Sequence, residues 1–271
     1  MQPQVEIINF DPDNVTQHGF FCYKSKKKTE GYRRKLAWLH ARFAEGMQMK
    51  MVVEDGRSVG FIEYIPGEYG WRAVHAPNTM LIHCLWVVGK GKGKGYGSRL
   101  LELCLEDARQ RGLDGVTMVS SSRVWLAHRD IFLKNGFQKI DEAPPSFDLL
   151  YYPFTNAAPP RFPTDWAARQ AQFGSDLTVI HSDQCPYIPD AIRLVLETAV
   201  VPGVPTRTVA LTNARDVQNT SPSAYGLFGI VYNGRLLAYH YLLPKELIQL
   251  LKDANATSDG SSPGAAEGLA R

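Results

Sequence analysis

A run of alternating glycines and lysines, residues 89–97, is the part of this sequence best suited to hold a ligand. It follows the apolar segment Leu85–Val88 and leads into a helical pattern that starts at Tyr96. Glycines let the main chain approach a ligand and turn its N–H groups inward, and the first turn of a helix adds free N–H donors with a partial positive charge. Three interspersed lysines add full charges. These residues predict a cradle for a diphosphate.

The spacing narrows the kind of cradle. A P-loop needs Gly-x-x-x-x-Gly-Lys-Ser/Thr, which this stretch does not contain, and a dinucleotide-binding fold places its glycines after the first strand, whereas here a predicted hairpin and a third strand come first. The pattern resembles the GNAT acetyltransferases, which bind acetyl-CoA with an Arg/Gln-x-x-Gly-x-Gly/Ala loop five residues after a strand valine. Counted from Val87, the fifth residue is Lys92, and the residues up to Gly97 complete the pattern with lysine in place of Arg/Gln.

A second motif supports this resemblance, which covers roughly residues 1–142. GNAT proteins carry a later helix that ends in an aromatic residue followed shortly by Gly-Phe, and Ile131–Phe137 has that form. The resemblance implies that acetyl-CoA, or another acyl-CoA, is the co-substrate. It also implies the residues that contact it, which are Leu85, Trp86, Val87, Lys92, Gly93, Lys94, Gly95, Tyr96, Gly97, Ser98 and Phe132.

The motif departs from the family at one residue that matters for mechanism. The position four residues before Gly136 usually holds a tyrosine that gives a proton to the departing CoA thiolate, but here it is Phe132. The family's asparagine seven residues earlier is replaced by Trp125. Either another group or water protonates the thiolate, or the domain binds acyl-CoA without ordinary chemistry.

Acyl transfer to an amine needs the amine in its neutral form, so a base or a chain of waters is expected near the thioester. His83 precedes Leu85 by two residues on the same predicted strand. In the arylalkylamine branch of the GNAT family a histidine at the corresponding position helps to deprotonate the amine. The resemblance makes His83 the first candidate, with a pKa near neutral, and a hydrogen-bonded core histidine is the alternative. Glu63 and His128 are weaker candidates.

The second half of the chain holds one further candidate, Cys185, in a strand–turn–helix segment that reads Cys-Pro-Tyr. It resembles the start of the glutaredoxin and thioredoxin fold, except that Ile188 replaces the second cysteine of Cys-x-x-Cys. A cysteine at a helix N-terminus has a lowered pKa, which predicts a nucleophilic thiol, and a structural turn is the alternative. Taken whole, the chain resembles bacterial acetyltransferases with a YoaP-like C-terminal domain.

The elements that position these residues follow from hydrophobic periodicity and from turn signals at Asp55-Gly56 and Asn233-Gly234. In the first part we expect strands at residues 49–53, 59–65, 80–88, 115–120 and 137–140, and helices at 31–45, 96–111 and 123–135. In the second part we expect strands at 177–181, 206–211, 227–232 and 236–241, and helices at 188–199 and 244–251.

The predicted fold class is α/β, with two domains. Residues 1–150 form a GNAT domain, for which the family implies a mixed central sheet with helices on both faces, and residues 164–253 form a small thioredoxin-like α/β domain. Six prolines between residues 143 and 163 predict a linker at 151–163. The tail, residues 254–271, is rich in Ala, Gly and Ser and is predicted to be disordered.

Composition excludes several classes of protein. The 271 residues carry a net charge of +3, which is too weak for a general nucleic-acid-binding protein, and their apolar runs are too short to span a bilayer. The N-terminus shows no secretion signal, and the four cysteines lack the spacing of a disulfide framework or a zinc site. We therefore expect a cytoplasmic protein without a metal, and a homodimer remains open.

These observations predict an acyl-CoA-dependent N-acyltransferase that acts on a small amine or an amino-acid-like acceptor. Three alternatives stay open at this point. The protein could transfer an aminoacyl group from charged tRNA, bind CoA as a non-catalytic sensor of metabolites, or act as a thiol-redox protein through Cys185.

Overall fold

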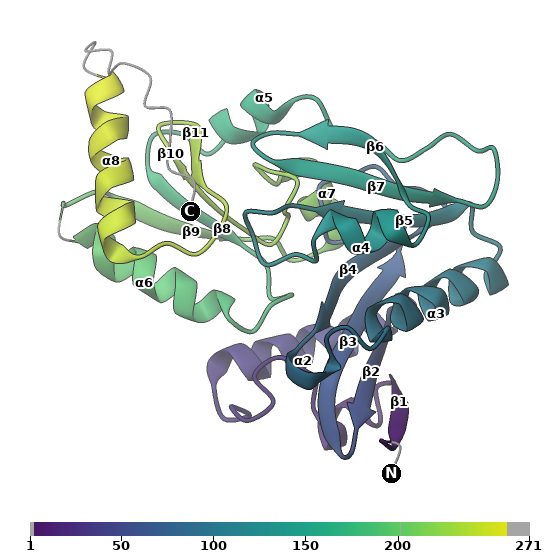
Figure 1. The fold of residues 1–271 in the computed structure, drawn as a ribbon. Helices are drawn as coiled ribbons and strands as arrows, with labels where there is room; N and C mark the ends of the chain where they lie inside the picture. Colours follow the sequence, from purple (N-terminus) through teal and green to yellow (C-terminus); the bar gives the residue numbers. More distant parts are fainter. Residues whose placement is uncertain (1–2, 201, 259–271) are drawn as a thin grey trace.

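A computed structural model describes residues 3–200 and 202–258, which form two units, each built on one β-sheet (Figure 1). The larger sheet has the strand order β1-β2-β3-β4-β5-β7-β6. Strands β4 and β5 pair in parallel, whereas the other neighbouring strands of this sheet pair antiparallel, so the sheet is mixed. Its strands are β1 (Val5–Phe10), β2 (Gln48–Glu54), β3 (Arg57–Pro66), β4 (Thr79–Val87), β5 (Gly115–Ser120), β6 (Gln138–Ala143) and β7 (Phe147–Pro153).

Helices cover the two faces of this sheet. On one face α2 (Glu30–Phe43) packs Trp38 and Leu39 into a core that includes Phe61 of β3. On the other face α3 (Tyr96–Gln110) packs against β3, β4 and β5. Successive strand residues point to opposite faces, so Phe61 belongs to the α2 core and Ile62 to the α3 core. The short helices α1 (Val15–His18) and α4 (Arg129–Lys134) complete the first unit.

Strands β4 and β5 separate partway along their length, and this separation positions the site. They pair only from Thr79↔Gly115 to Ile82↔Met118. Beyond Ile82, β4 continues to Val87 without β5 beside it, and it leads directly into the glycine loop and α3. The separation therefore frees one edge of β4 over the residues that precede the loop.

The second unit is a four-stranded sheet with the order β11-β10-β8-β9. The central strand β8 is parallel to β9 and antiparallel to β10, and the β10–β11 hairpin turns at Asn233 and Gly234, where both φ angles are positive. Its strands are β8 (Leu177–His181), β9 (Thr206–Ala210), β10 (Phe228–Tyr232) and β11 (Arg235–Ala238), and its helices are α5 (Trp166–Ala171), α6 (Ile188–Val200), α7 (Ala214–Thr220) and α8 (Pro244–Ser258).

Several sequence predictions need correction. The helix expected at 123–135 spans only Arg129–Lys134, because the His128 side chain caps it by accepting from the N–H of Asp130. The strands β1 and β7 and the helices α1, α5 and α7 were not predicted. The proposed linker at 151–163 begins inside β7, and its last part packs on the first unit, where Phe162 is buried and His75 pairs with Arg161.

The prediction of disorder from residue 254 onward is wrong for residues 254–258, which belong to α8. The remainder of that segment, residues 259–271, lies outside the described residues. No helix within residues 3–200 and 202–258 combines the length and the apolar character needed to cross a membrane.

The two units are closely docked. Gly31 of α2 lies so near the turn before α6 that a Cβ at this residue would be 1.8 Å from the carbonyl oxygen of Pro186. The Gln218 amide of α7 donates to the backbone carbonyl of Gly70 at 2.9 Å, and the Tyr23 hydroxyl donates to Asp190 at 2.6 Å. These contacts fix the second unit over the α2 side of the first.

Candidate active site

The glycine loop has the geometry of an anion cradle at its C-terminal half. Gly93 and Gly95 adopt φ angles of +76° and +82°, and Gly95 is the N-cap of α3 without any side-chain cap. The first N–H groups of α3 have no partner within the helix and carry its positive dipole end. A Cβ on Gly93 or Gly95 would meet no atom of the described residues within 4 Å. The free space and the free donors fit a phosphate group.

Two other glycines of the loop serve packing. A Cβ on Gly97 would lie 2.5 Å from the Ile131 side chain, and one on Gly91 would lie 2.9 Å from Val59. These glycines let α3 and the loop approach α4 and β3. The same glycine-rich run therefore contains packing positions and ligand-facing positions that the sequence alone does not separate.

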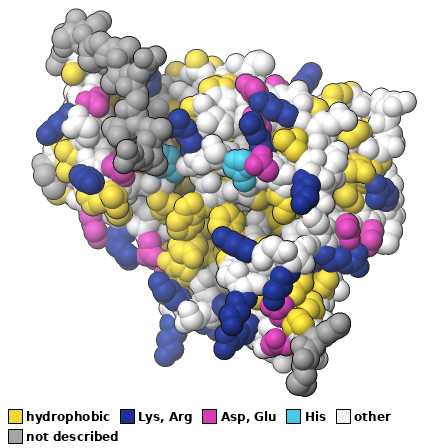
Figure 2. All heavy atoms as spheres, viewed as in Figure 1, with side chains coloured by type: hydrophobic (Ala, Val, Ile, Leu, Met, Phe, Trp, Pro, Cys, Tyr) yellow, Lys and Arg dark blue, Asp and Glu magenta, His cyan; other side chains and the backbone are white. Residues whose placement is uncertain are grey.

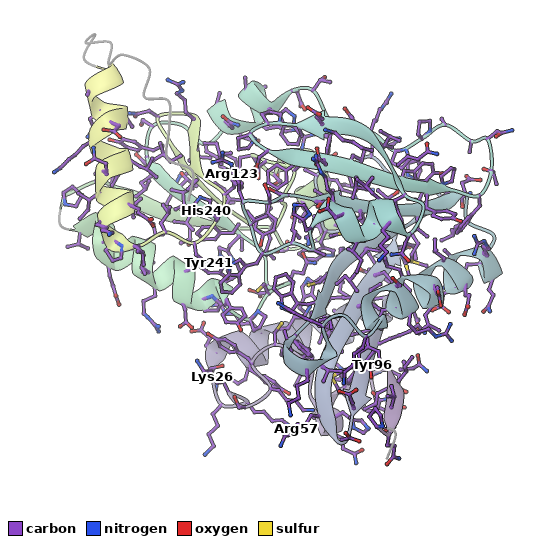
Figure 3. The ribbon with its side chains drawn as sticks, viewed as in Figure 1. Lys26, Arg57, Tyr96, Arg123, His240 and Tyr241 are labelled. Atoms are coloured by element: carbon purple, nitrogen blue, oxygen red, sulfur yellow. The ribbon has the colours of Figure 1, made fainter. Side chains whose placement is uncertain are left out.

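Glu54, at the end of β2, is hydrogen-bonded to two side chains of the glycine loop and of the start of α3. Its carboxylate accepts a hydrogen bond from the Lys94 ammonium and another from the Tyr96 hydroxyl, each at 2.6 Å. These bonds lower the pKa of Glu54, with Lys94 as the larger cause. Lys94 is thus paired with a carboxylate of the protein, although it is exposed, as Lys90 and Lys92 are. Figure 3 shows Tyr96 near the β2–β3 hairpin that carries Arg57.

A cavity of about 380 Å³ lies where the two units meet. The first unit contributes residues of the segment before α2 and of α2, β3 and β4, including Trp86 and Val88 next to the glycine loop. The second unit contributes the turn before α6 and the segments around β10 and β11, including Tyr225 and Tyr241. The cavity is thus shared between the units and adjoins the free edge of β4.

Lys35, Glu63 and His83 meet at the cavity wall and are almost fully buried. The Lys35 ammonium lies 2.6 Å from one oxygen of Glu63, and His83 Nδ1 lies 3.6 Å from the other. Despite the burial of its carboxylate, the pKa of Glu63 is lowered to about 2, because Lys35 and His83 outweigh the desolvation. Glu63 is therefore a stable anion inside the cavity.

His83 is in the predicted place, but its protonation differs from the expectation. The backbone N–H of Trp71 donates to His83 Nε2 at 2.9 Å, so the ring proton sits on Nδ1 and faces Glu63. Burial lowers the pKa of His83 to about 4. The expectation that His83 titrates near neutral pH is wrong, because the interior disfavours the charged imidazolium.

Arg72, which follows β3, lines the cavity and is 2% exposed. Its guanidinium donates to the carbonyls of Trp71 and His83 and to the Gln184 side chain of the second unit, at 2.6–2.8 Å. Its Nε has no hydrogen-bond partner in the described structure. Burial lowers the pKa of Arg72.

Cys185 also lines the cavity, but its environment differs from the prediction. Burial raises the pKa of its thiol, and this effect exceeds the opposing hydrogen bond from the backbone of Tyr187 and the influence of Tyr241. The expected lowered pKa at a helix N-terminus is therefore wrong. Cys22 also lines the cavity and is similar, since burial raises its pKa to about 12. Figure 3 shows Tyr241 in the region where the units meet.

Two other predicted site residues lie apart from this cavity. His128 is the exposed cap of α4 and pairs with Asp130 at 3.1 Å. Phe132 is fully buried against Phe137, with ring centroids 5.4 Å apart, and does not line the cavity. Trp125, in contrast, lies at the cavity and is 61% exposed.

Sequence reasoning missed Lys35, Arg72 and the wall supplied by the second unit. A signal for Lys35 was present, because it lies on the same helical face as Tyr32 and Leu39, where a lysine is unusual. Arg72 lies in a segment without periodicity, and its burial depends on Gln184, which is 112 residues away in the sequence.

A mixed sheet whose parallel strands separate, followed by a glycine loop at a helix N-terminus, is typical of acyltransferases of the GNAT class. The sequence profile of the acetyltransferase (GNAT) family matches residues 13–129. The chain is 30% identical over 253 residues to the uncharacterized N-acetyltransferase YoaP of Bacillus subtilis (strain 168). This match covers 90% of this chain and 97% of that protein. The chain belongs to the GNAT family of acetyltransferases and is an acyltransferase enzyme.

Solved structures with weaker similarity are also acetyltransferases. The PaiA N-acetyltransferase of Thermoplasma acidophilum, in complex with coenzyme A, is 14% identical with a TM-score of 0.41, over 56% of this chain and 99% of that chain. YhbS of Escherichia coli, in complex with CoA, is 12% identical with a TM-score of 0.42, over 60% of this chain and 92% of that chain.

Proposed function

We propose that this protein transfers the acyl group of an acyl-CoA, with acetyl-CoA as the first choice, to the amine of a small acceptor bound in the shared cavity. The observation that supports this most is the position of the cavity beside the free edge of β4. That edge leads straight into the cradle at Gly93 and Gly95. A pyrophosphate at the cradle places the rest of the donor along β4, with its thioester toward the cavity.

The residues of the cavity suit the acceptor side of the reaction. When bound, the acyl-CoA supplies an activated carbonyl. The amine nitrogen attacks this carbon, a C–N bond forms, and the C–S bond breaks with its electron pair on the sulfur. The proton lost by the nitrogen passes through water and leaves the CoA as a thiol. Among the described residues that line the cavity, Glu63 is the one carboxylate. It is positioned to hold the acceptor's ammonium group, which first loses one proton to water so that the neutral amine can attack.

Under this proposal His83 is a positioning residue. Its Nδ1–H faces Glu63, while its other nitrogen is occupied by the N–H of Trp71. Glu63 and His83 have pKa values of about 2 and about 4, so neither titrates between about pH 5 and 9. The pH dependence of the reaction is then set by the acceptor amine itself.

The experiment measures release of the CoA thiol from acetyl-CoA across a panel of amines. With a productive acceptor, kcat/KM should rise about tenfold per pH unit below the amine's own pKa, and the profile should move when a less basic amine replaces it. A plateau reached near pH 6.5 with every amine would assign the base to a protein group instead. Failure to bind CoA or to acetylate any amine would overturn the proposed function.

We also propose that the second unit is thioredoxin-like and serves as a wall of the acceptor site. Its strand order β11-β10-β8-β9, with one parallel pair and a terminal hairpin, supports this assignment. A redox role for Cys185 is disfavoured, because burial raises the pKa of the thiol and Ile188 replaces the resolving cysteine. The Cys-Pro-Tyr turn contributes contacts to the cavity instead.

A further inference from the structure

The cavity contains a buried positive charge without a counter-ion. Within residues 3–200 and 202–258, no carboxylate lies within 4.0 Å of a nitrogen of Arg72, although its side chain is 2% exposed. Its bonded partners are two backbone carbonyls and the neutral amide of Gln184. Arginine is rarely buried unless it is paired, because removing its charge from water is costly. The Nε–H of Arg72 also lacks a hydrogen-bond acceptor among the described residues, so this side chain needs both a negative charge and an acceptor.

The other charges around the cavity do not supply the missing anion. Glu63 is paired with Lys35 at 2.6 Å, and His83 is neutral above about pH 4. The thiols of Cys22 and Cys185 stay protonated because burial raises their pKa values. The lining therefore carries a net charge of about one positive unit, which favours a ligand with one anionic group.

The walls of the cavity are aromatic and come from both units. Phe21 and Phe61 stack with ring centroids 4.9 Å apart in the first unit. Trp125 also lines the cavity, with its ring centroid 5.3 Å from that of Tyr187, edge-on, and 5.5 Å from that of Tyr241. Hydrophobic side chains gather on the surface near the junction of the units, with lysines and arginines below them (Figure 2). A volume of about 380 Å³ with such walls accommodates one ring-bearing molecule of amino-acid size.

We infer that the acceptor is an amine that carries both a carboxylate and an aromatic ring, as in an aromatic amino acid or a close analogue. The inference rests on the proposed acyltransferase function. The carboxylate neutralises Arg72 and accepts from its Nε–H, the ring lies among Trp125, Tyr187 and Tyr241, and the amine faces Glu63. Each of the three groups of the acceptor thus has a partner of suitable chemistry in the cavity, and for Arg72 the carboxylate also supplies the counter-ion and the Nε–H acceptor that the described residues lack.

The test compares acceptors that differ by one group. Acetylation of tryptophan and phenylalanine is measured beside tryptamine and phenethylamine, which lack the carboxylate, and alanine, which lacks the ring. Rates are compared per neutral amine, after each acceptor has been titrated. The aromatic amino acids should exceed both kinds of control by about 10- to 100-fold in kcat/KM, the range for a hydrogen bond to a charged group. Equal or better turnover of the amines without a carboxylate would overturn the inference.

Two variants assign the preference to residues. Arg72→Met should abolish the preference for the carboxylate while CoA affinity stays unchanged, since Arg72 does not contact the glycine loop. Trp125→Ala, at a largely exposed side chain, should reduce turnover of phenylalanine toward that of alanine. If Arg72→Met does not fold, the panel on the wild-type enzyme still decides.

The outcomes separate the inference from the proposed function. Acetylation confined to amines without a ring or a carboxylate overturns the inference and leaves the acyltransferase function standing. CoA binding without acetylation of any aromatic amino acid also overturns the inference. Absence of both CoA binding and transfer to any amine overturns the proposed function itself.

Discussion

Replacing Gly95 with valine tests the phosphate cradle directly. Gly95 has φ +82° and ψ 0°, a left-handed conformation that costs a residue with a Cβ about 1–2 kcal/mol. No described atom lies within 4 Å of the new Cβ, so the loss of folding stability should come from this backbone term alone. The same Cβ would occupy space proposed for the phosphate. Loss of about two charge-assisted hydrogen bonds weakens CoA binding by roughly 100-fold or more.

The chain provides a matched control for this substitution. Gly112, beyond the other end of α3, has φ +68° and also has nothing within 4 Å of its Cβ position. Gly112→Val should cost similar stability in thermal unfolding but leave the CoA affinity from titration calorimetry unchanged. Gly95→Asn, whose side chain tolerates the left-handed region, should regain stability without regaining affinity. Equal CoA affinity in folded Gly95→Val and wild-type protein would refute the cradle.

The remaining predictions concern buried titratable groups. In the unfolded chain His83 binds a proton below about pH 6.5, but in the folded protein it does so only below about pH 4. Between these two pH values the unfolded state binds more protons than the folded state. The free energy of unfolding should therefore fall as the pH drops through this window, by up to about 1.4 kcal/mol per pH unit. Denaturant unfolding at several pH values measures this slope, and it should disappear in His83→Gln; an unchanged slope in that variant would assign it to other groups. Iodoacetamide should alkylate folded Cys185 more slowly than a free thiol at pH 7.5, because burial raises its pKa; a faster reaction, located by mass spectrometry, would restore a nucleophilic role.

Local signals gave the parts of the fold that depend on neighbouring residues. The strand Gly115–Ser120 and the start of α3 at Tyr96 lie where predicted. Both follow from signals that extend over only a few residues, namely the apolar pattern and the glycines that precede α3. The last three residues of β7, 151–153, were assigned to a linker because prolines flank the strand, yet Pro153 is the strand's last residue, where it interrupts little. The helix α7 was missed because it is short and its polar sequence offers little periodicity.

The candidate site likewise has one part that local sequence signals predict and another part that they do not. The proposed cradle could be predicted locally, because a phosphate is bound by backbone groups that glycines expose within one loop, and Gly93 and Gly95 do adopt positive φ angles. The burial of Lys35 and Arg72 was not, because it arises from tertiary contacts that cover each charge from distant segments. Glu63 and His83 were proposed from strand position, but their pKa values depend on burial and on the neighbouring charge of Lys35, which no local pattern reveals.

The docking of the two units gives a physical reason for their presence in one chain. Arg72 belongs to the first unit, yet Gln184 of the second unit accepts from its guanidinium at 2.6 Å, so the orientation of this charge depends on both. The turn that carries Gln184 also packs Pro186 against Gly31 of α2, at a distance that leaves no room for a side chain. A segment resembling a redox motif thus supplies packing and orientation at the shared cavity. Since the first unit contains the proposed cradle and the second completes the cavity, the proposed function predicts that donor binding depends mainly on the first unit and acceptor selection on both.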